Sequence, residues 1–162
     1  MRNATLVLLI NRDTNEICLG MKKRGFGESR WNGFGGKVKE DEEIKDAAIR
    51  EIYEETSNNE NGSGVVVEKK ELEKVATLDF IFPHEPNWDQ RVHVFKVYNW
   101  EGILNESEEM KPKWFNINNV PYDDMWADDI HWLPRVLKGE KVNAEFSFDE
   151  KDNIIESKIE IS

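Results

Sequence analysis

The chain of 162 residues has a single cysteine, no long hydrophobic run and too few basic residues to balance its acids. Cys18 can form no internal disulfide, and between two aliphatic neighbours it is expected to be a core thiol in a reducing compartment. The apolar stretch from Ala4 to Ile10 ends at Asn11-Arg12-Asp13, so it predicts a strand rather than a signal peptide or a membrane span. We therefore expect a cytoplasmic protein.

Lysine and arginine number 22 against 33 aspartates and glutamates, which gives a formal net charge of −11. Binding to a nucleic acid polymer depends on basic contacts to phosphate, so this charge argues against that class of partner. A small anionic ligand such as a nucleotide needs cations between the two negative charges, which predicts metal dependence. A hydrophobic content of 38%, with no linker or repeat, predicts a single domain over residues 1–162. We also expect the protein to be a monomer.

Two familiar phosphate-binding motifs are missing, the P-loop and the strand-coupled dinucleotide fingerprint. Glycine is instead concentrated in the segment 20–38, at Gly20, Gly25, Gly27, Gly33, Gly35 and Gly36. This density indicates backbone that turns sharply or passes close to another group. A loop of this kind that leads into a helix can give amides or a carbonyl to a complex of phosphate and metal.

The helix that follows this loop carries acids on its inward face. At about 100° per residue, Glu51 and Glu55 point in nearly the same direction, between Ala47 and Ala48. A solvated acidic face, the simpler explanation in an acidic protein, would lie opposite the apolar stripe. Inward carboxylates must be neutralised, and clustered acids favour a hard cation such as Mg²⁺ or Mn²⁺.

Together these residues resemble a known family. The order Gly36, Glu42, Arg50-Glu51 and Glu54-Glu55 is similar to the Nudix box, and the runs 20–26 and 30–38 resemble the MutT-like Nudix hydrolases of oxidised purine nucleoside triphosphates. The resemblance implies the Nudix fold, a mixed β-sheet sandwiched between α-helices (α/β/α). It also implies attack of metal-activated water on a phosphoanhydride, with Mg²⁺ or Mn²⁺ as cofactor and a nucleoside monophosphate and pyrophosphate as products.

The resemblance also assigns roles to the acids, which with Arg50 form the expected catalytic set. The implied metal ligands are Gly36, through its carbonyl, and Glu51, Glu54, Glu55 and Glu109. Arg50 is expected to orient a carboxylate of the box, and Glu42 to organise the start of the helix. Spacing leaves open whether Glu51, Glu54 or Glu109 takes the proton from the attacking water.

The resemblance also implies a substrate pocket formed by residues outside the acids of the box: Thr5, Lys22, Phe26, Asn32, Phe80, Met110, Trp126, Asp128 and Asp129. Trp126 offers a stacking plane for a purine. Asp128 and Asp129 can share a proton, so that one donates to the base edge while the other accepts. Such a pair admits 8-oxoguanine and 2-hydroxyadenine nucleotides, and the Asn32 amide suits the same task. Without the resemblance, Trp126 would be interpreted as a packing residue and the two acids as favourable charges at a helix start.

Alternation and turn residues predict strands at 4–10, 16–22, 75–82, 92–100, 114–116, 144–148 and 154–161, and helices at 41–56 and 128–138. The first helix is expected to begin at Asp41 and to end in a left-handed cap at Asn58, followed by a polar loop over 59–64. The alternation in 145–148 and 159–161 predicts half-buried antiparallel strands. His93 is interpreted as a strand residue paired across the sheet.

The segment 87–91 departs from the relatives, with Trp88, Asp89, Gln90 and Arg91 and an apparent insertion. It leaves the base preference open, and with it a second function, hydrolysis of another diphosphate such as a nucleotide sugar or a dinucleotide. A third alternative is a catalytically silent nucleotide-binding module, which would not need the full set of box glutamates. The basic trio 22–24 is either a solvated strand end or local positive charge beside the glycine loop.

Overall fold

The computed structural model describes residues 1–58, 60 and 62–162. These residues form one mixed sheet in the order β3-β2-β1-β5-β4-β7-β8, with β6 paired to β2 beside this path. The strands are β1 (Arg2–Asn11), β2 (Glu16–Lys22), β3 (Trp31–Asn32), β4 (Glu73–Ile81), β5 (Gln90–Val97), β6 (Met110–Asn116), β7 (Val142–Phe148) and β8 (Ile154–Ile161). The α-helices are α1 (Ile44–Thr56) and α2 (Asp129–Leu137). β1 runs parallel to β5, and β4 to β7, whereas the other pairs are antiparallel.

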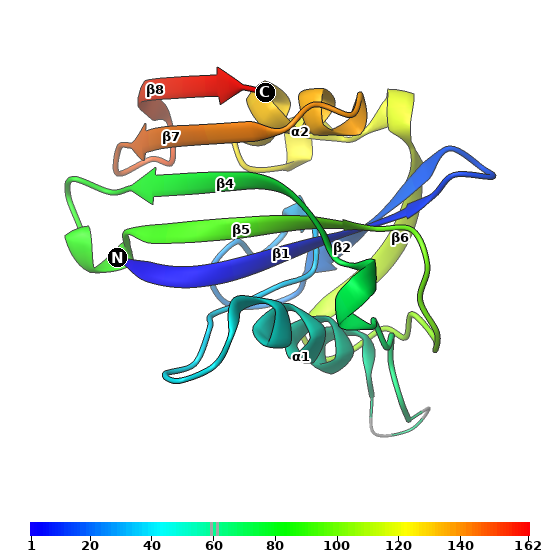
Figure 1. The fold of residues 1–162 in the computed structure, drawn as a ribbon. Helices are drawn as coiled ribbons and strands as arrows, with labels where there is room; N and C mark the ends of the chain where they lie inside the picture. Colours follow the sequence, from blue (N-terminus) through cyan, green and yellow to red (C-terminus); the bar gives the residue numbers. More distant parts are fainter. Residues whose placement is uncertain (59, 61) are drawn as a thin grey trace.

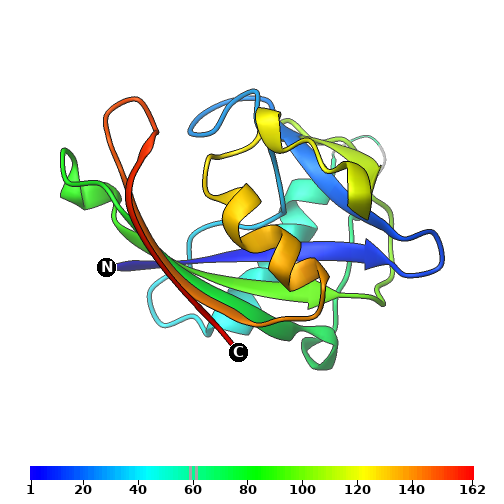
Figure 2. The same cartoon turned by 90° about the horizontal axis from the view of Figure 1, so that it is seen from above.

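The sheet lies between the two helices, with α1 on one face and α2 on the other (Figure 1). β1 supplies both interfaces, because successive side chains of a strand point to opposite faces. Leu6 and Leu8 join the core against α2, whereas Val7 and Leu9 join the core against α1. In the view from above, α2 crosses over the middle strands of the sheet (Figure 2). The predicted α/β/α sandwich is confirmed.

The glycine-rich segment runs beside β1 almost as a further strand. Val7 and Phe34 exchange backbone hydrogen bonds, and the Thr5 N–H donates to the Gly36 carbonyl at 2.8 Å. A Cβ on Gly35 would overlap the Thr5 carbonyl, so only glycine permits this approach. The predicted close passage of backbone is confirmed, and the group that it approaches is a buried strand.

Helix α1 begins at Ile44, later than predicted, because Asp41 has a φ of +64° that an α-helix does not allow. The predicted left-handed cap is also wrong. Asn58 has no positive φ, and the C-cap is Ser57 in an extended conformation, with φ −96° and ψ 150°. The hydroxyls of Thr56 and Ser57 each donate to a carbonyl one turn earlier at 2.6 Å. Side chains therefore supply hydrogen bonds to carbonyls at the helix end, as the backbone of a left-handed turn would otherwise do.

Several strand boundaries differ from the prediction where pairing outweighs local propensity. β6 begins at Met110 rather than at residue 114, because it pairs with β2 along its whole length and accommodates Pro112 as an edge strand. β5 covers Gln90–Val97 instead of 92–100, and the two-residue β3 has no signal in the sequence. The predicted half-burial is wrong for β8, which is exposed along nearly its whole length as the outer strand of the sheet.

The interpretations of Cys18 as a core residue and of His93 as a strand residue paired across the sheet are confirmed. Cys18 is fully buried, and burial raises the pKa of its thiol to about 12, which makes it a poor nucleophile. His93 lies on β5, with one ring nitrogen 2.8 Å from Lys74 Nζ and the other 3.0 Å from Asn3 Oδ1. The predicted polar loop at 59–64 lies partly outside the described residues. In the part of the chain that the structure describes, no helix has the length and apolar character needed to cross a membrane.

Candidate active site

Glu55 is the most deeply buried acid of α1, with 5% of its surface exposed. Its carboxylate accepts a hydrogen bond from the Gly35 N–H at 2.6 Å. Burial raises the pKa of this carboxyl to about 8; the Gly35 amide and Lys22 oppose the shift, whereas the charges of Glu51 and Glu109 reinforce it. A cation bound here would stabilise the ionised carboxylate, because it would offset the lost hydration.

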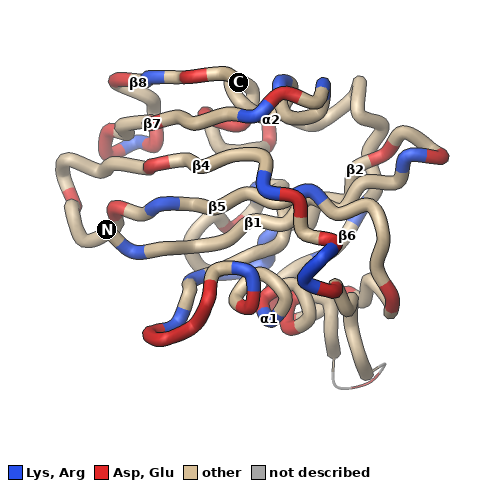
Figure 3. Tube along the Cα trace, in the orientation of Figure 1, with Lys and Arg blue, Asp and Glu red and all other residues tan. Residues whose placement is uncertain are grey.

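Arg50 organises the other acids of the box. Its guanidinium donates to Glu42 at 2.8 and 2.9 Å, to Glu51 at 2.8 Å and to Glu54 at 3.4 Å. The paired hydrogen bonds from Arg50 lower the pKa of Glu42 to about 2. Acidic residues gather on α1 and on the loop before it (Figure 3), and this one guanidinium fixes the directions of three of them.

Glu109 approaches the site from the loop before β6, and its carboxylate lies 3.9 Å from Lys22 Nζ. Lys23 and Arg24 pair in the same way with two further acids of that loop. Each member of the basic trio therefore faces an acid of that loop, and the pair formed by Arg24 and Glu108 is largely exposed to solvent. Lys22 itself is half-buried, and its positive charge opposes the rise in the pKa of Glu55.

A cavity of about 940 Å³ lies between α1, the glycine segment and the loop before β6. The five predicted metal ligands all line it: Gly36, Glu51, Glu54, Glu55 and Glu109. Their carboxylate and carbonyl oxygens, together with the buried carboxylate of Glu55, suit a hard divalent cation. A Cβ on Gly36 would lie 2.5 Å from the Glu51 carboxylate carbon, so the wall has no room for a side chain there. Within the described residues, no three acids, histidines or cysteines are close enough together to form a metal-binding group. Glu55 instead accepts the Gly35 N–H, and Arg50 donates to Glu51.

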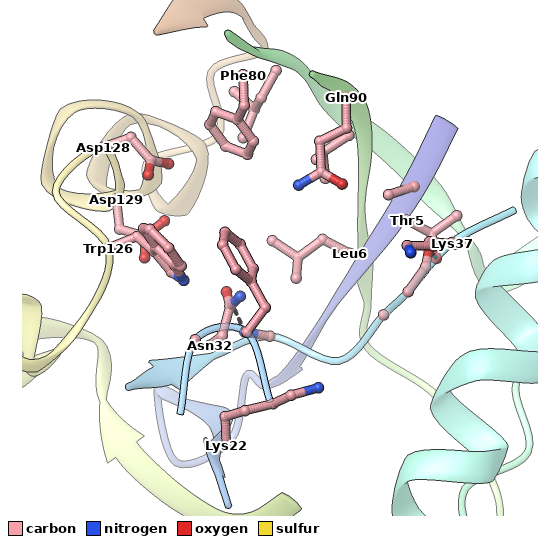
Figure 4. A pocket seen from close by; sticks show the side chains of 18 of the residues that line it. Thr5, Leu6, Lys22, Asn32, Lys37, Phe80, Gln90, Trp126, Asp128 and Asp129 are labelled. Atoms are coloured by element: carbon pink, nitrogen blue, oxygen red, sulfur yellow. Dashed lines mark hydrogen bonds between the residues drawn. The ribbon is translucent and has the colours of Figure 1, made fainter. Parts of the chain in front are cut away.

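A second cavity, of about 270 Å³, lies beside the first, and all nine residues expected to bind substrate line it. Its walls come from separate elements, and their polar side chains converge on one space (Figure 4). Both cavities are lined by Lys22, Gly35, Gly36, Lys37 and Glu55. The two cavities are therefore joined along the glycine segment.

Asp128 and Asp129 are buried at the start of α2. Asp128 Oδ2 accepts a hydrogen bond from Trp132 Nε1 at 2.8 Å, whereas Asp129 Oδ2 is the one buried side-chain oxygen or nitrogen of the described residues without a partner. Burial raises the pKa of both carboxyls, and the charge of Asp128 raises that of Asp129 further. This environment favours a proton on Asp129, which fits the hypothesis of a shared proton.

Trp126 forms the wall next to the acid pair. Phe26 stacks on it with ring centroids 4.9 Å apart, and the Arg30 guanidinium lies 4.0 Å from the centroid of its ring. Arg30 is held in turn by Asp152 at 3.3 Å. Phe26 is 57% exposed and lies on a loop with two positive-φ glycines, Gly25 and Gly27.

The second cavity is also lined by residues that the sequence does not predict, several of them on strands whose register sets their direction: Ala4, Leu6, Lys37, Leu78, Phe82, Gln90, Val92, Trp132 and Phe148. The residues of the divergent segment 87–91 make separate contacts in the structure. Trp88 packs on Phe26 at 5.9 Å, Asp89 accepts the Phe82 N–H at 2.8 Å, and Arg91 pairs with another strand residue. Of these residues, Gln90 alone lines the cavity. Its alternation with Val92 along one strand is the signal that the sequence offered.

The fold thus places an acid-lined cavity beside a second cavity that contains a buried pair of aspartates. A family model, the NUDIX domain, matches residues 1–136, and the chain belongs to the Nudix hydrolase family. Members of this family generally require a divalent metal ion.

The chain is also similar to curated proteins along most of its length. The chain is 43% identical over 156 residues to the oxidized purine nucleoside triphosphate hydrolase of Danio rerio, covering 96% of this chain and 92% of that protein. It is 43% identical over 151 residues to the protein of the same name from Mus musculus, covering 93% and 89%. Among solved structures, the MutT protein of Bacillus halodurans superimposes with a TM-score of 0.82 over 99% of this chain and 98% of its own, and at 21% identity this likeness concerns the fold.

Proposed function

We propose that this protein hydrolyses oxidised purine nucleoside triphosphates, 8-oxo-dGTP and 2-hydroxy-dATP among them, to the nucleoside monophosphate and pyrophosphate. One observation carries the proposal: a pocket with a buried pair of aspartates joins an acid-lined cavity along Gly35 and Gly36. A purine edge against Asp128 and Asp129 extends its phosphates toward the acids of α1. The names of the two relatives at 43% identity support the same substrate class.

The base is recognised by groups that both donate and accept. A protonated Asp129 donates to the base edge, and the ionised Asp128 accepts from it. Asn32 adds a donor, because its Oδ1 accepts the Gly33 N–H at 2.9 Å and its NH₂ remains for the ligand. Since the proton can reside on either acid, the pair matches bases with different donor patterns, and Trp126 supplies the stacking surface.

Hydrolysis requires water to attack phosphorus while negative charge builds on the phosphate oxygens. Mg²⁺, for which Mn²⁺ can substitute, would be held by Gly36, Glu51, Glu54, Glu55 and Glu109, and when bound it supplies an activated water and neutralises phosphate charge. Arg50 keeps the carboxylates of Glu51 and Glu54 directed at the cavity. Lys22, at the junction of both cavities, neutralises a phosphate oxygen on the substrate side.

The rest of the proposal concerns how the protein is organised. The chain acts as one monomeric domain over residues 1–162, in the cytoplasm, on a nucleotide and without a nucleic acid polymer or membrane as partner. The net charge of −11 and the buried Cys18 support this part.

A pyrophosphate-release assay with Mg²⁺ on a panel of nucleotides tests the proposal. We expect 8-oxo-dGTP and 2-hydroxy-dATP to exceed dGTP and dATP in kcat/KM, and EDTA to abolish turnover. A preference for nucleotide sugars or dinucleotides would replace the proposal with another Nudix activity. Tight binding of an oxidised nucleotide without any turnover would replace it with a receptor role.

A further inference from the structure

Gln90 is a polar residue of the base pocket to which the proposed function gives no task. It is the first residue of β5, half-buried and opposite Phe80 in the antiparallel register. Its side-chain amide points into the cavity, across the space from Asp128 and Asp129 (Figure 4). No group in the described part of the chain forms a hydrogen bond with this amide. A half-buried amide left without partners inside a pocket is placed to bond a ligand.

Its neighbours in the divergent segment are already engaged. Arg91 points to the opposite face of the strand and donates to Asp79 at 2.8 and 3.0 Å. Asp89 closes a turn through the Phe82 N–H, and Trp88 packs among aromatic rings at the rim. The departure of this segment from the relatives therefore reaches the pocket through one side chain, Gln90.

The two ends of the pocket fix the orientation of a purine in it. The Asp128-Asp129 pair lies at one end, and Thr5 and Lys37 mark the other, where the glycine segment leads to the acids of α1 (Figure 4). Phosphates are attached through the sugar to N9 of the five-membered ring, so that ring faces the second end and the six-membered ring faces the aspartates. Gln90 lies toward the second end and therefore lies beside the five-membered ring.

Oxidation at C8 changes the hydrogen-bonding pattern of that ring. Guanine presents an acceptor at N7 and an apolar C–H at C8, whereas 8-oxoguanine presents an N7–H donor beside the O8 acceptor. A carboxamide is complementary to the second pattern, because its carbonyl accepts from N7–H while its NH₂ donates to O8. In 2-hydroxyadenine the added oxygen lies on the six-membered ring, and N7 stays an acceptor that can engage only the NH₂.

We propose that Gln90 reads the oxidised five-membered ring and sets the preference of the pocket for 8-oxopurines over purines oxidised at C2. The inference rests on the proposed function, since it assigns a task within the same pocket. It divides recognition between two edges: Asp128 and Asp129 read the six-membered ring, and Gln90 distinguishes the lesion at C8.

The test is Gln90→Met, which keeps side-chain length and removes both hydrogen-bonding groups. We expect its kcat/KM for 8-oxo-dGTP to fall about tenfold relative to that for 2-hydroxy-dATP, the effect of losing one or two hydrogen bonds to the base. The ratio of 8-oxo-dGTP to dGTP should fall in the same way. Arg91→Met, on the opposite face of the same strand, is the matched control and should leave both ratios unchanged.

Calorimetry with 8-oxo-dGMP, 2-hydroxy-dAMP and dGMP repeats the comparison without turnover. If the wild-type protein prefers 8-oxo-dGMP and Gln90→Met loses that preference, the inference stands even if no triphosphate is hydrolysed and the proposed function fails. If the variant loses affinity or kcat/KM equally for all three bases, Gln90 contacts the sugar or only packs, and the inference fails while the proposed function survives. Unchanged ratios also overturn it.

Discussion

Replacing Glu55 by glutamine separates the destabilising effect of a buried charge from its role in the reaction. The variant keeps an oxygen that can accept the Gly35 N–H and removes the ionisable group. Burial raises the pKa of Glu55 from 4.5 to about 8, so the folded state holds the proton more tightly than the unfolded chain. The stability contributed by protonated Glu55 is therefore fully present below pH 4.5 and is lost as the pH rises to 8.

The expected difference follows from the same values. A tenfold change in proton affinity corresponds to about 1.4 kcal/mol, so ionised Glu55 lowers the free energy of unfolding by up to about 4 kcal/mol at pH 8 without metal. Glu55→Gln keeps that stability. We therefore expect its free energy of unfolding to exceed that of the wild type by about 2 to 4 kcal/mol at pH 8 in EDTA, and to equal it near pH 4. Mg²⁺ should stabilise the wild type and not the variant, because it binds the native carboxylates. Turnover should fall at least about a thousandfold in the variant.

Urea unfolding at pH 4, 6 and 8, in EDTA and in Mg²⁺, measures these effects beside a turnover assay. Glu43→Gln is a suitable control, since Glu43 lies outside the cavity with 74% of its side chain exposed and should change neither quantity. Full turnover in Glu55→Gln would refute the metal assignment. A variant less stable than wild type at pH 8 in EDTA would refute the account of the buried charge.

Three further substitutions test other parts of the site. Asp128→Asn should preserve kcat within about threefold and change the preference between 8-oxo-dGTP and 2-hydroxy-dATP at least about tenfold, because the pair can no longer exchange a proton; an unchanged ratio in steady-state kinetics would count against it. Gly36→Ala places a methyl group 2.5 Å from the Glu51 carboxylate carbon, and we expect Mn²⁺ affinity by calorimetry to fall at least about tenfold. Arg50→Lys keeps the charge but loses the paired hydrogen bonds to Glu42, so kcat/KM should fall about tenfold or more. NMR titration should find the pKa of Glu42 returned from about 2 toward 4.5. Retention of the low pKa would contradict the role given to Arg50.

Features that depend on local periodicity could be predicted from the sequence. The inward direction of Glu55 follows from its spacing along one helix, and the glycines of segment 33–36 predict a close passage of backbone without knowledge of its partner. The helix end could not be predicted in the same way, because Thr56 and Ser57 provide hydroxyls that compete with a left-handed cap. Several energetically similar caps fit one sequence, and tertiary packing selects among them.

Features that depend on register between distant segments were largely beyond the sequence. The direction of Gln90 depends on its pairing with Phe80, and β8 remains exposed because no layer covers the outer part of the sheet around it. The pocket residues that were predicted, such as Asn32 and Trp126, came from the resemblance to a family. Their burial, their partners and the raised pKa values of the acid pair appear only when the chain is folded.

The glycine segment beside β1 has a consequence for substrate length. At one end Asn32 lines the second cavity, and at the other the Gly35 N–H donates to Glu55 and Gly36 lies against Glu51. Hydrogen bonds to β1 hold the segment along its length, so on the proposed function the segment sets the separation between the base and the reacting phosphorus. The protein would thus select substrates by the distance between base and phosphoanhydride. A nucleotide with a longer or shorter connection between the two would bring the wrong bond to the acids.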